Sequence, residues 1–388
     1  MFDDVTAAEL RRRVGTKWRR HGPDVIEAWV AEMDFPPAPA IADAVADAVR
    51  RGDAGYPPLE AESDLPAALC DWLRHVYGWS VDPATVFVTS DLLRALETCL
   101  DLITPPGTPV VLPTPSYPPF FEVLALASRP VVDVPMAGCD GRKSDGGAPT
   151  LDLAGIEDAL SGGADAIILC NPHNPLGRAF DRDELLALSD VASAYGARVI
   201  ADEVHAPLVY PGRVHVPFAS LSARAAEQSV TLTSASKGWN IPGLRCAQVV
   251  LTNPTDAAAW RKLSWLRTQG AATPGIVANV AAYRSGGPWL GDAVAYLDAN
   301  RHLLAQLLRE FLPELRHRTP EAGYLAWIDC RALPVADPAG FFLRQAKVAL
   351  HDGALFGPAG KGFVRLNFAT SAAILEQMVE AMAGAVRR

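Results

Sequence analysis

Short apolar runs alternate with helix-like stretches through the middle of this sequence. Four of these runs are DAIILC at 165–170, ARVIAD at 197–202, SVTLTS at 229–234 and CAQVVL at 246–251. A continuous apolar run of this length is typical of a strand buried on both faces, and the intervening segments supply helices or turns. The pattern therefore predicts an α/β fold in which a mostly parallel sheet lies between layers of helices.

The same patterns suggest how the chain divides into domains. TVFVT at 85–89 is typical of a strand, and a helical pattern follows from Leu92 to Ile103. After about residue 285 the order changes to a long helical pattern at 289–311, a strand, a helix, a second strand and a final helix. We predict an N-terminal segment (1–50) that packs with a small C-terminal α+β domain (286–388), and a large domain (51–285) that holds the main sheet.

Composition excludes several classes of function. The 388 residues carry a net charge of −9, which argues against nucleic-acid binding, and the basic cluster RRRVGTKWRR at 11–20 is interpreted as a solvated helix and loop. No apolar run reaches the roughly 18 residues that suggest a membrane span, and MFDDVTAAEL does not resemble a secretory signal. The six cysteines are scattered without a CxxC pair, so we expect buried thiols in a cytoplasmic protein and no metal site.

Three polar segments directly follow three of the predicted strands. NPHNPLGR follows AIILC, DEVH closes VIADEVH, and SASKGWN follows VTLTS. Ligands of open α/β sheets bind beyond the carboxyl ends of the strands, and these ends meet at one edge when the strands are parallel. We therefore expect the three segments to converge on an active site.

Taken singly, the residues in these segments have ordinary structural interpretations. Lys237 could be a surface lysine, Asp202 a helix cap, Asn174 part of a turn and Arg365 a salt-bridged strand residue. Jointly, their order and spacing resemble the fold-type I pyridoxal-phosphate (PLP) enzymes of the class I/II aminotransferase superfamily, over nearly the whole chain. The resemblance implies a sheet of seven strands. Further segments are similar to the cystathionine β-lyase-like branch, the cysteine C–S β-lyases: WVAEMDFPPAPAI, GYP at 55–57, PSYPPFF, NPHNPLGR, DEVHAPLVYPGRVHVPF and SASKGWNIPGLR.

This resemblance implies roles at the ring end of the cofactor. Lys237 would form the Schiff base with PLP, and its amine, once freed, would remove the substrate Cα proton. Asp202 would keep the pyridine nitrogen protonated, because a nearby opposite charge favours the charged form. Asn174 would hydrogen-bond the phenolic oxygen. His205 falls where many relatives place a tyrosine that bonds the same oxygen, and a purely structural histidine is the alternative.

The resemblance also implies a phosphate site. Ser234, Ser236 and Arg245 match the family's phosphate-binding residues, and Arg245 can contact two phosphate oxygens at once. The helix N-terminus in TSDLLRAL would add backbone N–H groups, which places Ser90, Asp91, Leu92 and Leu93 beside the phosphate. Relatives usually carry glycine where this chain has Asp91. We expect Asp91 to cap the helix with its carboxylate turned away from the phosphate, or to reach the substrate pocket.

Three further residues complete the implied site. Tyr117 would stack on the cofactor ring, and Tyr56 would reach the phosphate of a neighbouring subunit, which makes the protein a homodimer with shared active sites. Arg365 would bind the α-carboxylate of an amino-acid substrate as a bidentate pair, and Asn174 and Tyr56 would also contact the substrate. Lys237 or a nearby tyrosine would protonate a departing sulfur.

Several functions remain open from these residues. The branch resemblance implies β-elimination of cystathionine or a cysteine S-conjugate to a thiol, pyruvate and ammonia. An aminotransferase would use the same residues, and Asp91 keeps open a decarboxylating or oxidative-deaminating PLP enzyme of a biosynthetic pathway. A regulatory binding protein is the least favoured alternative, because no helix-turn-helix extension or basic domain flanks the core.

Overall fold

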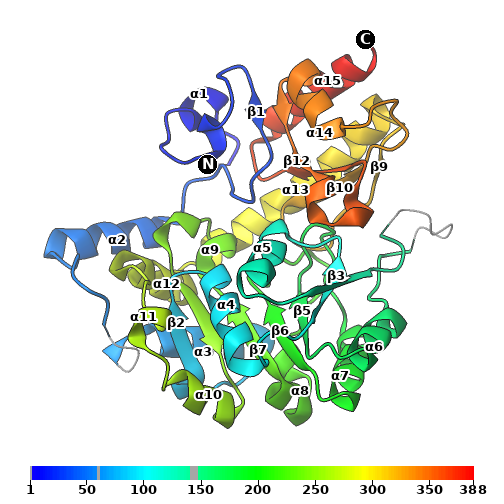
Figure 1. Cartoon of the computed structure of the whole chain (residues 1–388). Helices are drawn as coiled ribbons and strands as arrows, with labels where there is room; N and C mark the ends of the chain where they lie inside the picture. The colour runs from blue at the N-terminus through cyan, green and yellow to red at the C-terminus, as the bar shows by residue number, and fades with distance from the viewer. Residues whose placement is uncertain (1, 59–61, 140–146) are drawn as a thin grey trace.

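A seven-stranded sheet forms the centre of the computed structural model, which describes all residues except 1, 59–61 and 140–146 (Figure 1). Its strand order is β2-β8-β7-β6-β5-β3-β4. Neighbours from β7 to β4 pair in parallel, whereas β8 is antiparallel to both β7 and β2. The predicted α/β fold with a mostly parallel sheet is thus confirmed. The strands are β2 (Val86–Thr89), β3 (Val110–Thr114), β4 (Val131–Pro135), β5 (Ala166–Cys170), β6 (Arg198–Asp202), β7 (Ser229–Thr233) and β8 (Ala247–Val250).

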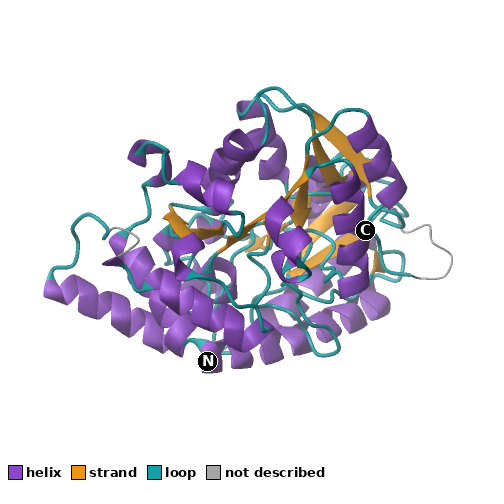
Figure 2. Ribbon diagram, turned by 90° about the horizontal axis from the view of Figure 1, so that it is seen from below, coloured by secondary structure: helices purple, strands orange, loops and turns teal. Residues whose placement is uncertain are grey.

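Helices cover both faces of this sheet (Figure 2). In β6, Val199 and Ala201 pack with apolar residues of α6 and α7, while Ile200 points to the opposite face and packs with α4 and α5. Both faces of the strand are therefore buried, which explains its uninterrupted apolar sequence. The helices of this part are α3 (Leu65–Tyr77), α4 (Leu92–Ile103), α5 (Pro118–Leu126), α6 (Leu153–Ser161), α7 (Arg182–Ala194), α8 (Ala223–Gln228), α9 (Ala235–Gly238), α10 (Pro254–Trp260), α11 (Trp265–Thr268) and α12 (Thr273–Ser285).

The C-terminal part is built on a long helix and a second sheet. Helix α13 (Gly287–Phe311) leads into a four-stranded antiparallel sheet of order β12-β13-β10-β9. This arrangement confirms the predicted α+β character of the region. The remaining elements are β9 (Arg316–His317), β10 (Leu325–Asp329), α14 (Pro338–Phe341), a π-helical turn (Phe342–Ala346), β11 (Val348–Ala349), β12 (His351–Asp352), β13 (Phe363–Asn367) and α15 (Ala372–Val386).

The N-terminal residues lie beside this C-terminal part, as the blue and orange ribbons of Figure 1 show. After α1 (Ala7–Leu10), strand β1 (Ile26–Glu27) pairs in parallel with β11. Helix α2 (Pro39–Arg51) instead packs along α12. The chain thus passes from the C-terminal part to the large-sheet part before residue 39, while the division at residues 50 and 285 stays a proposal.

The described residues show neither a membrane helix nor a metal cluster. Short 3₁₀ turns connect several of the elements and are given at the end of this paragraph. No described helix is both long and apolar enough to cross a membrane. Within the same ranges, no three histidine, cysteine or acidic side chains are grouped as a metal ion would require. All six cysteines are buried. The 3₁₀ turns are Lys17–Arg19, Pro83–Thr85, Phe218–Ser220, Pro242–Leu244, Gly353–Phe356 and Pro358–Gly360.

Candidate active site

A cavity of about 370 Å³ lies at the carboxyl ends of β5, β6 and β7. The register of the sheet places Cys170, Asp202 and Leu232 side by side at the ends of these three strands. The segments that follow the strands therefore meet, as expected from a parallel sheet. Most of the residues singled out from the sequence line this cavity: Ser90, Asp91, Leu92, Leu93, Tyr117, Asn174, Asp202, His205, Ser234, Ser236, Lys237 and Arg245.

Lys237 lies in the first turn after β7, where the backbone begins the short helix α9. Its Nζ donates a hydrogen bond of 2.8 Å to the carbonyl oxygen of Ala31. Burial, together with the positive charge of Arg365, lowers the pKa of the Lys237 ammonium to about 8. The lowered pKa increases the fraction of Lys237 that is a neutral, nucleophilic amine near neutral pH.

The segment that contains Ala31 is fixed above the cavity by two asparagines. Asn240 accepts from Met33 N–H at 2.9 Å and donates to the carbonyls of Met33 and Phe35. Asn367 donates to the carbonyls of residues 30 and 32, each at 2.7 Å. These contacts join the N-terminal segment both to the Lys237 turn and to β13, and they leave Ala31 O facing the lysine.

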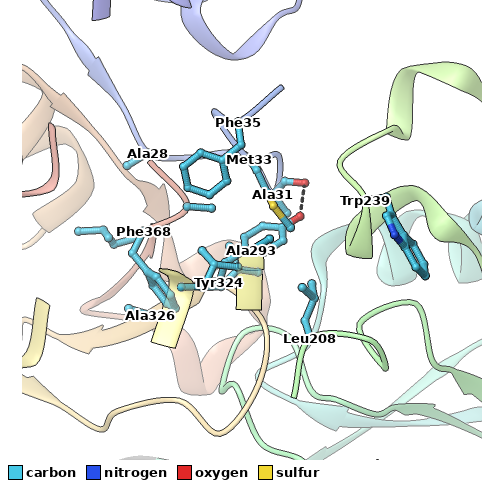
Figure 3. Close-up of a cluster of buried hydrophobic side chains, with 14 of the residues drawn as sticks. Ala28, Ala31, Met33, Phe35, Leu208, Trp239, Ala293, Tyr324, Ala326 and Phe368 are labelled. Atoms are coloured by element: carbon cyan, nitrogen blue, oxygen red, sulfur yellow. Dashed lines mark hydrogen bonds between the residues drawn. The ribbon is translucent and has the colours of Figure 1, made fainter. Parts of the chain in front are cut away.

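Packing beneath this segment adds a second contact to the same carbonyl. Figure 3 shows Met33 and Phe35 in one apolar cluster with Tyr324 and Phe368. The Tyr324 hydroxyl donates to Ala31 O at 3.1 Å, the dashed line in that view. Ala31 O therefore accepts hydrogen bonds from both Lys237 and Tyr324.

Asp202 ends β6 with its carboxylate in a buried position. Val204 N–H donates to it at 3.1 Å, but burial outweighs this contact and raises the pKa of the Asp202 carboxyl to about 6. A cationic partner placed against it would restore the charged form, since opposite charges stabilise each other in a poorly solvated site. The geometry suits a carboxylate that holds a proton on a heterocyclic nitrogen.

His205 lies in the same wall as a neutral imidazole. Burial, with the charges of Lys237 and Arg365 nearby, lowers the pKa of His205 to about 3. Its Nδ1 is buried and has no hydrogen-bond partner among the described residues. Because the His205 side chain also borders the cavity, a binding role is favoured over a purely structural one.

Arg365, on β13, is almost fully buried and lies directly behind Asn174. Its guanidinium donates to Asn174 Oδ1 at 3.0 Å, to Trp29 O at 2.8 Å and to His351 Nδ1 at 2.9 Å. Because a guanidinium can only donate, His351 Nδ1 must accept, and the neutral ring carries its proton on Nε2. Burial and the charge of Arg365 lower the pKa of His351 to about 3, which keeps the ring in this form.

At the far end of the cavity, Asp91 caps α4. Its Oδ1 accepts from the N–H groups of Leu93 at 3.0 Å and Arg94 at 2.9 Å, while Oδ2 pairs with Arg245 at 2.6 Å. The capping role expected from the sequence is therefore observed. Its second oxygen stays on the cavity wall and contacts the arginine assigned to the phosphate, so Asp91 reaches the pocket, the second of the two positions expected for it.

The two serines at this end differ in their contacts. The Ser234 hydroxyl donates to Cys246 O at 2.7 Å and accepts from Ser236 N–H at 3.0 Å, so its own proton is used within the protein. Ser236 is half-buried and borders the cavity. Ser236 is therefore the better placed of the two to donate to a bound anion.

The two tyrosines lie in different places. Tyr117 is half-buried at the N-terminus of α5 and lines the cavity, where burial raises the pKa of its phenol. Tyr56 is 97% exposed and lies outside the cavity, in a depression that Trp265 also lines. Within one chain, the structure does not bring Tyr56 to Lys237.

Sequence reasoning did not assign roles to Ala31 or His351. Ala31 acts through a backbone carbonyl 206 positions before Lys237, and no side-chain pattern reveals such a contact. His351 lies two residues before the glycine of HDG, and only the pairing of β12 with β13 places it beside Arg365. The segment WVAEMDF was singled out by resemblance, but its contact with the lysine was not.

The residues around the cavity fit an aldehyde cofactor that carries a basic ring nitrogen and a phosphate. Lys237 supplies an amine, and Asp202 a carboxylate for the ring nitrogen. Arg245, Ser236 and the N-terminus of α4 supply the donors that a phosphate needs. His205 adds a neutral imidazole to the same wall.

Proteins that are similar to this chain include PLP-dependent enzymes, which agrees with the cofactor that the cavity residues fit. A cystathionine beta-lyase of Corynebacterium glutamicum is 37% identical, covering 95% of this chain and 96% of its own length. A crystal structure from Corynebacterium diphtheriae, of a protein described as a PLP-dependent beta-cystathionase, superposes with a TM-score of 0.93 at 41% identity, covering 99% and 98% of the chains. Cystalysin of Treponema denticola, whose structure contains pyridoxal 5'-phosphate, gives 0.92 at 25% identity over 100% and 99%.

The family assignment rests on a match over most of the chain. The sequence profile described as aminotransferase class I and II matches residues 24–382. This range includes Lys237, Asp202 and Asn174, which line the cavity, and Arg365, which does not line it but donates to Asn174. The chain belongs to the aminotransferase class I and II family.

Proposed function

We propose that this protein is a PLP-dependent C–S β-lyase that converts cystathionine or a cysteine S-conjugate to a thiol, pyruvate and ammonia. The observation that carries the proposal is the position of Lys237, whose amine, with a pKa of about 8, lies in one cavity with Asp202 and beside the Arg365–Asn174 pair. The relatives that are 37% and 41% identical bear lyase names, which favours elimination among the reactions of this family.

The cavity residues divide between two ends of the cofactor. When bound, PLP withdraws electrons from the substrate Cα and so makes its proton acidic. Lys237 and Asp202 would hold the aldehyde and the ring nitrogen, with Asn174 and His205 beside the phenolic oxygen and Tyr117 against the ring face. Ser90, Ser236, Arg245 and the N-terminus of α4 would hold the phosphate.

Arg365 is suited to bind the substrate carboxylate and to orient the amino acid. Its side chain is held by three acceptors, so the guanidinium keeps one orientation. A buried guanidinium forms strong, directional hydrogen bonds to a carboxylate. Asn174 lies between this arginine and the cavity, and it contributes to the same end of the site.

Lys237 is the residue best placed to move the Cα proton. A lowered pKa makes its amine available as a base near neutral pH, and the resulting ammonium can return a proton. Elimination also needs an acid for the departing sulfur. Tyr117 is a candidate as well as Lys237, because burial raises the pKa of Tyr117 and keeps the phenol protonated.

We also propose a cytoplasmic homodimer with shared active sites. Tyr56 is 97% exposed, and Trp265 and Leu266 are each 65% exposed. Tyr56 and Trp265 line the same depression. Exposed aromatic and aliphatic side chains grouped in this way are typical of interfaces. In such a dimer Tyr56 would extend into the partner's cavity, as the family resemblance implies.

The reaction products distinguish the lyase from its alternatives. Purified protein with PLP is incubated with cystathionine or an S-alkyl cysteine, and pyruvate, free thiol and keto acids are measured. A lyase releases pyruvate and thiol in equal amounts. A keto acid that retains the sulfur, formed together with the amine form of the cofactor, would establish an aminotransferase instead, and carbon dioxide release would indicate a decarboxylase.

A further inference from the structure

The ion pair between Asp91 and Arg245 lies on the wall of the cavity, at the end assigned to the phosphate. Asp91 Oδ2 is 2.6 Å from the arginine NH2, and both residues line the cavity. Arg245 is the only arginine or lysine besides Lys237 among the described lining residues. The cation best placed to attract a phosphate is therefore already paired with a carboxylate of the same chain.

The described lining residues carry equal numbers of positive and negative side chains. Lys237 and Arg245 are the cations, and Asp91 and Asp202 are the anions. Lys237 and Asp202 belong to the end where the aldehyde and ring nitrogen bind, which leaves Arg245 and Asp91 at the phosphate end. A phosphate placed there is attracted by the arginine and repelled by the carboxylate beside it.

Helix capping alone does not explain the position of this carboxylate. Asp181 caps α7 with the same geometry, since its Oδ1 accepts from Asp183 N–H at 3.0 Å and Glu184 N–H at 2.9 Å. Asp91 also uses only Oδ1 for its cap. Its second oxygen accepts from the Ser90 hydroxyl at 3.2 Å and pairs with Arg245 at 2.6 Å, so the negative charge is placed against Arg245.

We propose that Asp91 offsets the charge of Arg245 and thereby weakens the hold of this protein on the phosphate of its cofactor. The inference rests on the proposed function, because it takes the ligand of this wall to be PLP. Asp91 then acts as a determinant of cofactor affinity that reaches the ligand through Arg245. The ion pair is partly exposed, 62% for Arg245 and 30% for Asp91, so solvent screens it and the effect is moderate.

A comparison of two aldehydes isolates the phosphate contribution. Pyridoxal lacks the phosphate but presents the same aldehyde and ring to Lys237, so the ratio of the dissociation constants of pyridoxal and PLP reports the phosphate alone. Both constants are measured by titrating the visible absorbance of the lysine-bound aldehyde. The variant is Asp91→Asn, which keeps a capping oxygen for Leu93 and Arg94 but removes the charge. Asp181→Asn is the matched control, since it makes the same change at an equivalent cap.

We expect Asp91→Asn to raise this ratio about two- to fivefold, the range expected for a partly screened charge pair, and Asp181→Asn to leave it unchanged. Arg245→Gln should lower the ratio by a larger factor in the Asp91→Asn background than in the wild-type protein, because an unopposed arginine contributes more.

A ratio that is unchanged or lower in Asp91→Asn would overturn the inference. A lower ratio would mean that Asp91 mainly positions Arg245 for the phosphate. Failure of the wild-type protein to bind either aldehyde would overturn the proposed function together with this inference. Binding of both aldehydes with an unaltered ratio would overturn the inference alone.

Discussion

The reactivity of Lys237 should depend on pH in a way that reports its surroundings. Burial and Arg365 lower the pKa of this ammonium from 10.5 to about 8. At pH 7, about one molecule in ten then carries the neutral amine, against about one in 3,000 for an ordinary lysine. The shift corresponds to about 3 kcal/mol. Since only the neutral amine attacks an aldehyde, the rate should rise as pH increases through about 8 and level off above it.

The assay is the rate at which excess pyridoxal combines with the cofactor-free protein, followed by visible absorbance from pH 6 to 10. Pyridoxal is chosen because it lacks a phosphate that would itself titrate in this range. A Lys237→Ala variant measures the contribution of the other five lysines, which is subtracted.

Two variants test the cause of the shift in opposite directions. Arg365→Gln removes a positive charge that lowers the pKa of Lys237, so the midpoint should move to higher pH. Asp202→Asn removes a negative charge that raises this pKa, so the midpoint should move to lower pH. A wild-type rate that continues to rise toward pH 10.5, or two variants that shift the midpoint in the same direction, would refute the electrostatic reasoning.

Three further predictions follow from individual contacts. Arg365→Lys should lower kcat/KM about 100-fold or more, because lysine cannot reproduce the bidentate carboxylate contact proposed for Arg365. Steady-state kinetics checks this, and a change below about threefold would contradict it. Asn240→Ala should lower the free energy of unfolding by about 2 kcal/mol, because Met33 and Phe35 lose three hydrogen bonds. Denaturant unfolding measures this change. An unchanged midpoint would show that other contacts replace these hydrogen bonds. If the Tyr117 phenol protonates the departing sulfur, Tyr117→Phe should slow turnover most for substrates whose thiol leaving group has a high pKa. Equal slowing for all thiols would show that Tyr117 is not the acid.

The sheet could be predicted from the sequence because its strands are buried on both faces. Val199, Ile200 and Ala201 must all be apolar when helices cover the two sides, and so the strand appears as an uninterrupted apolar run. The helix at Leu92–Ile103 was predicted with the observed bounds, since Asp91 marks its start. The antiparallel direction of β8 was not predicted, because an apolar run of four to six residues carries no information on strand direction.

The sequence predicts the place of a site residue only where that residue comes at or just after the end of a strand. Asn174, Asp202 and Lys237 come shortly after β5, at the end of β6 and shortly after β7, so their convergence follows from parallel pairing. The contact of Asp91 with Arg245 joins positions 154 residues apart, and nothing in either local sequence indicates it. The same holds for Ala31, whose contribution is a backbone carbonyl that any residue type could supply.

The central claim is that PLP is held in this cavity by Lys237, one of six lysines in the chain. Reduction of the protein–PLP complex with borohydride, followed by digestion and mass spectrometry, identifies the lysine that carries the cofactor. The account predicts one reduced cofactor per chain, located on the peptide that contains Lys237. A cofactor attached to any of the other five lysines, or spread over several lysines without enrichment at Lys237, would contradict it.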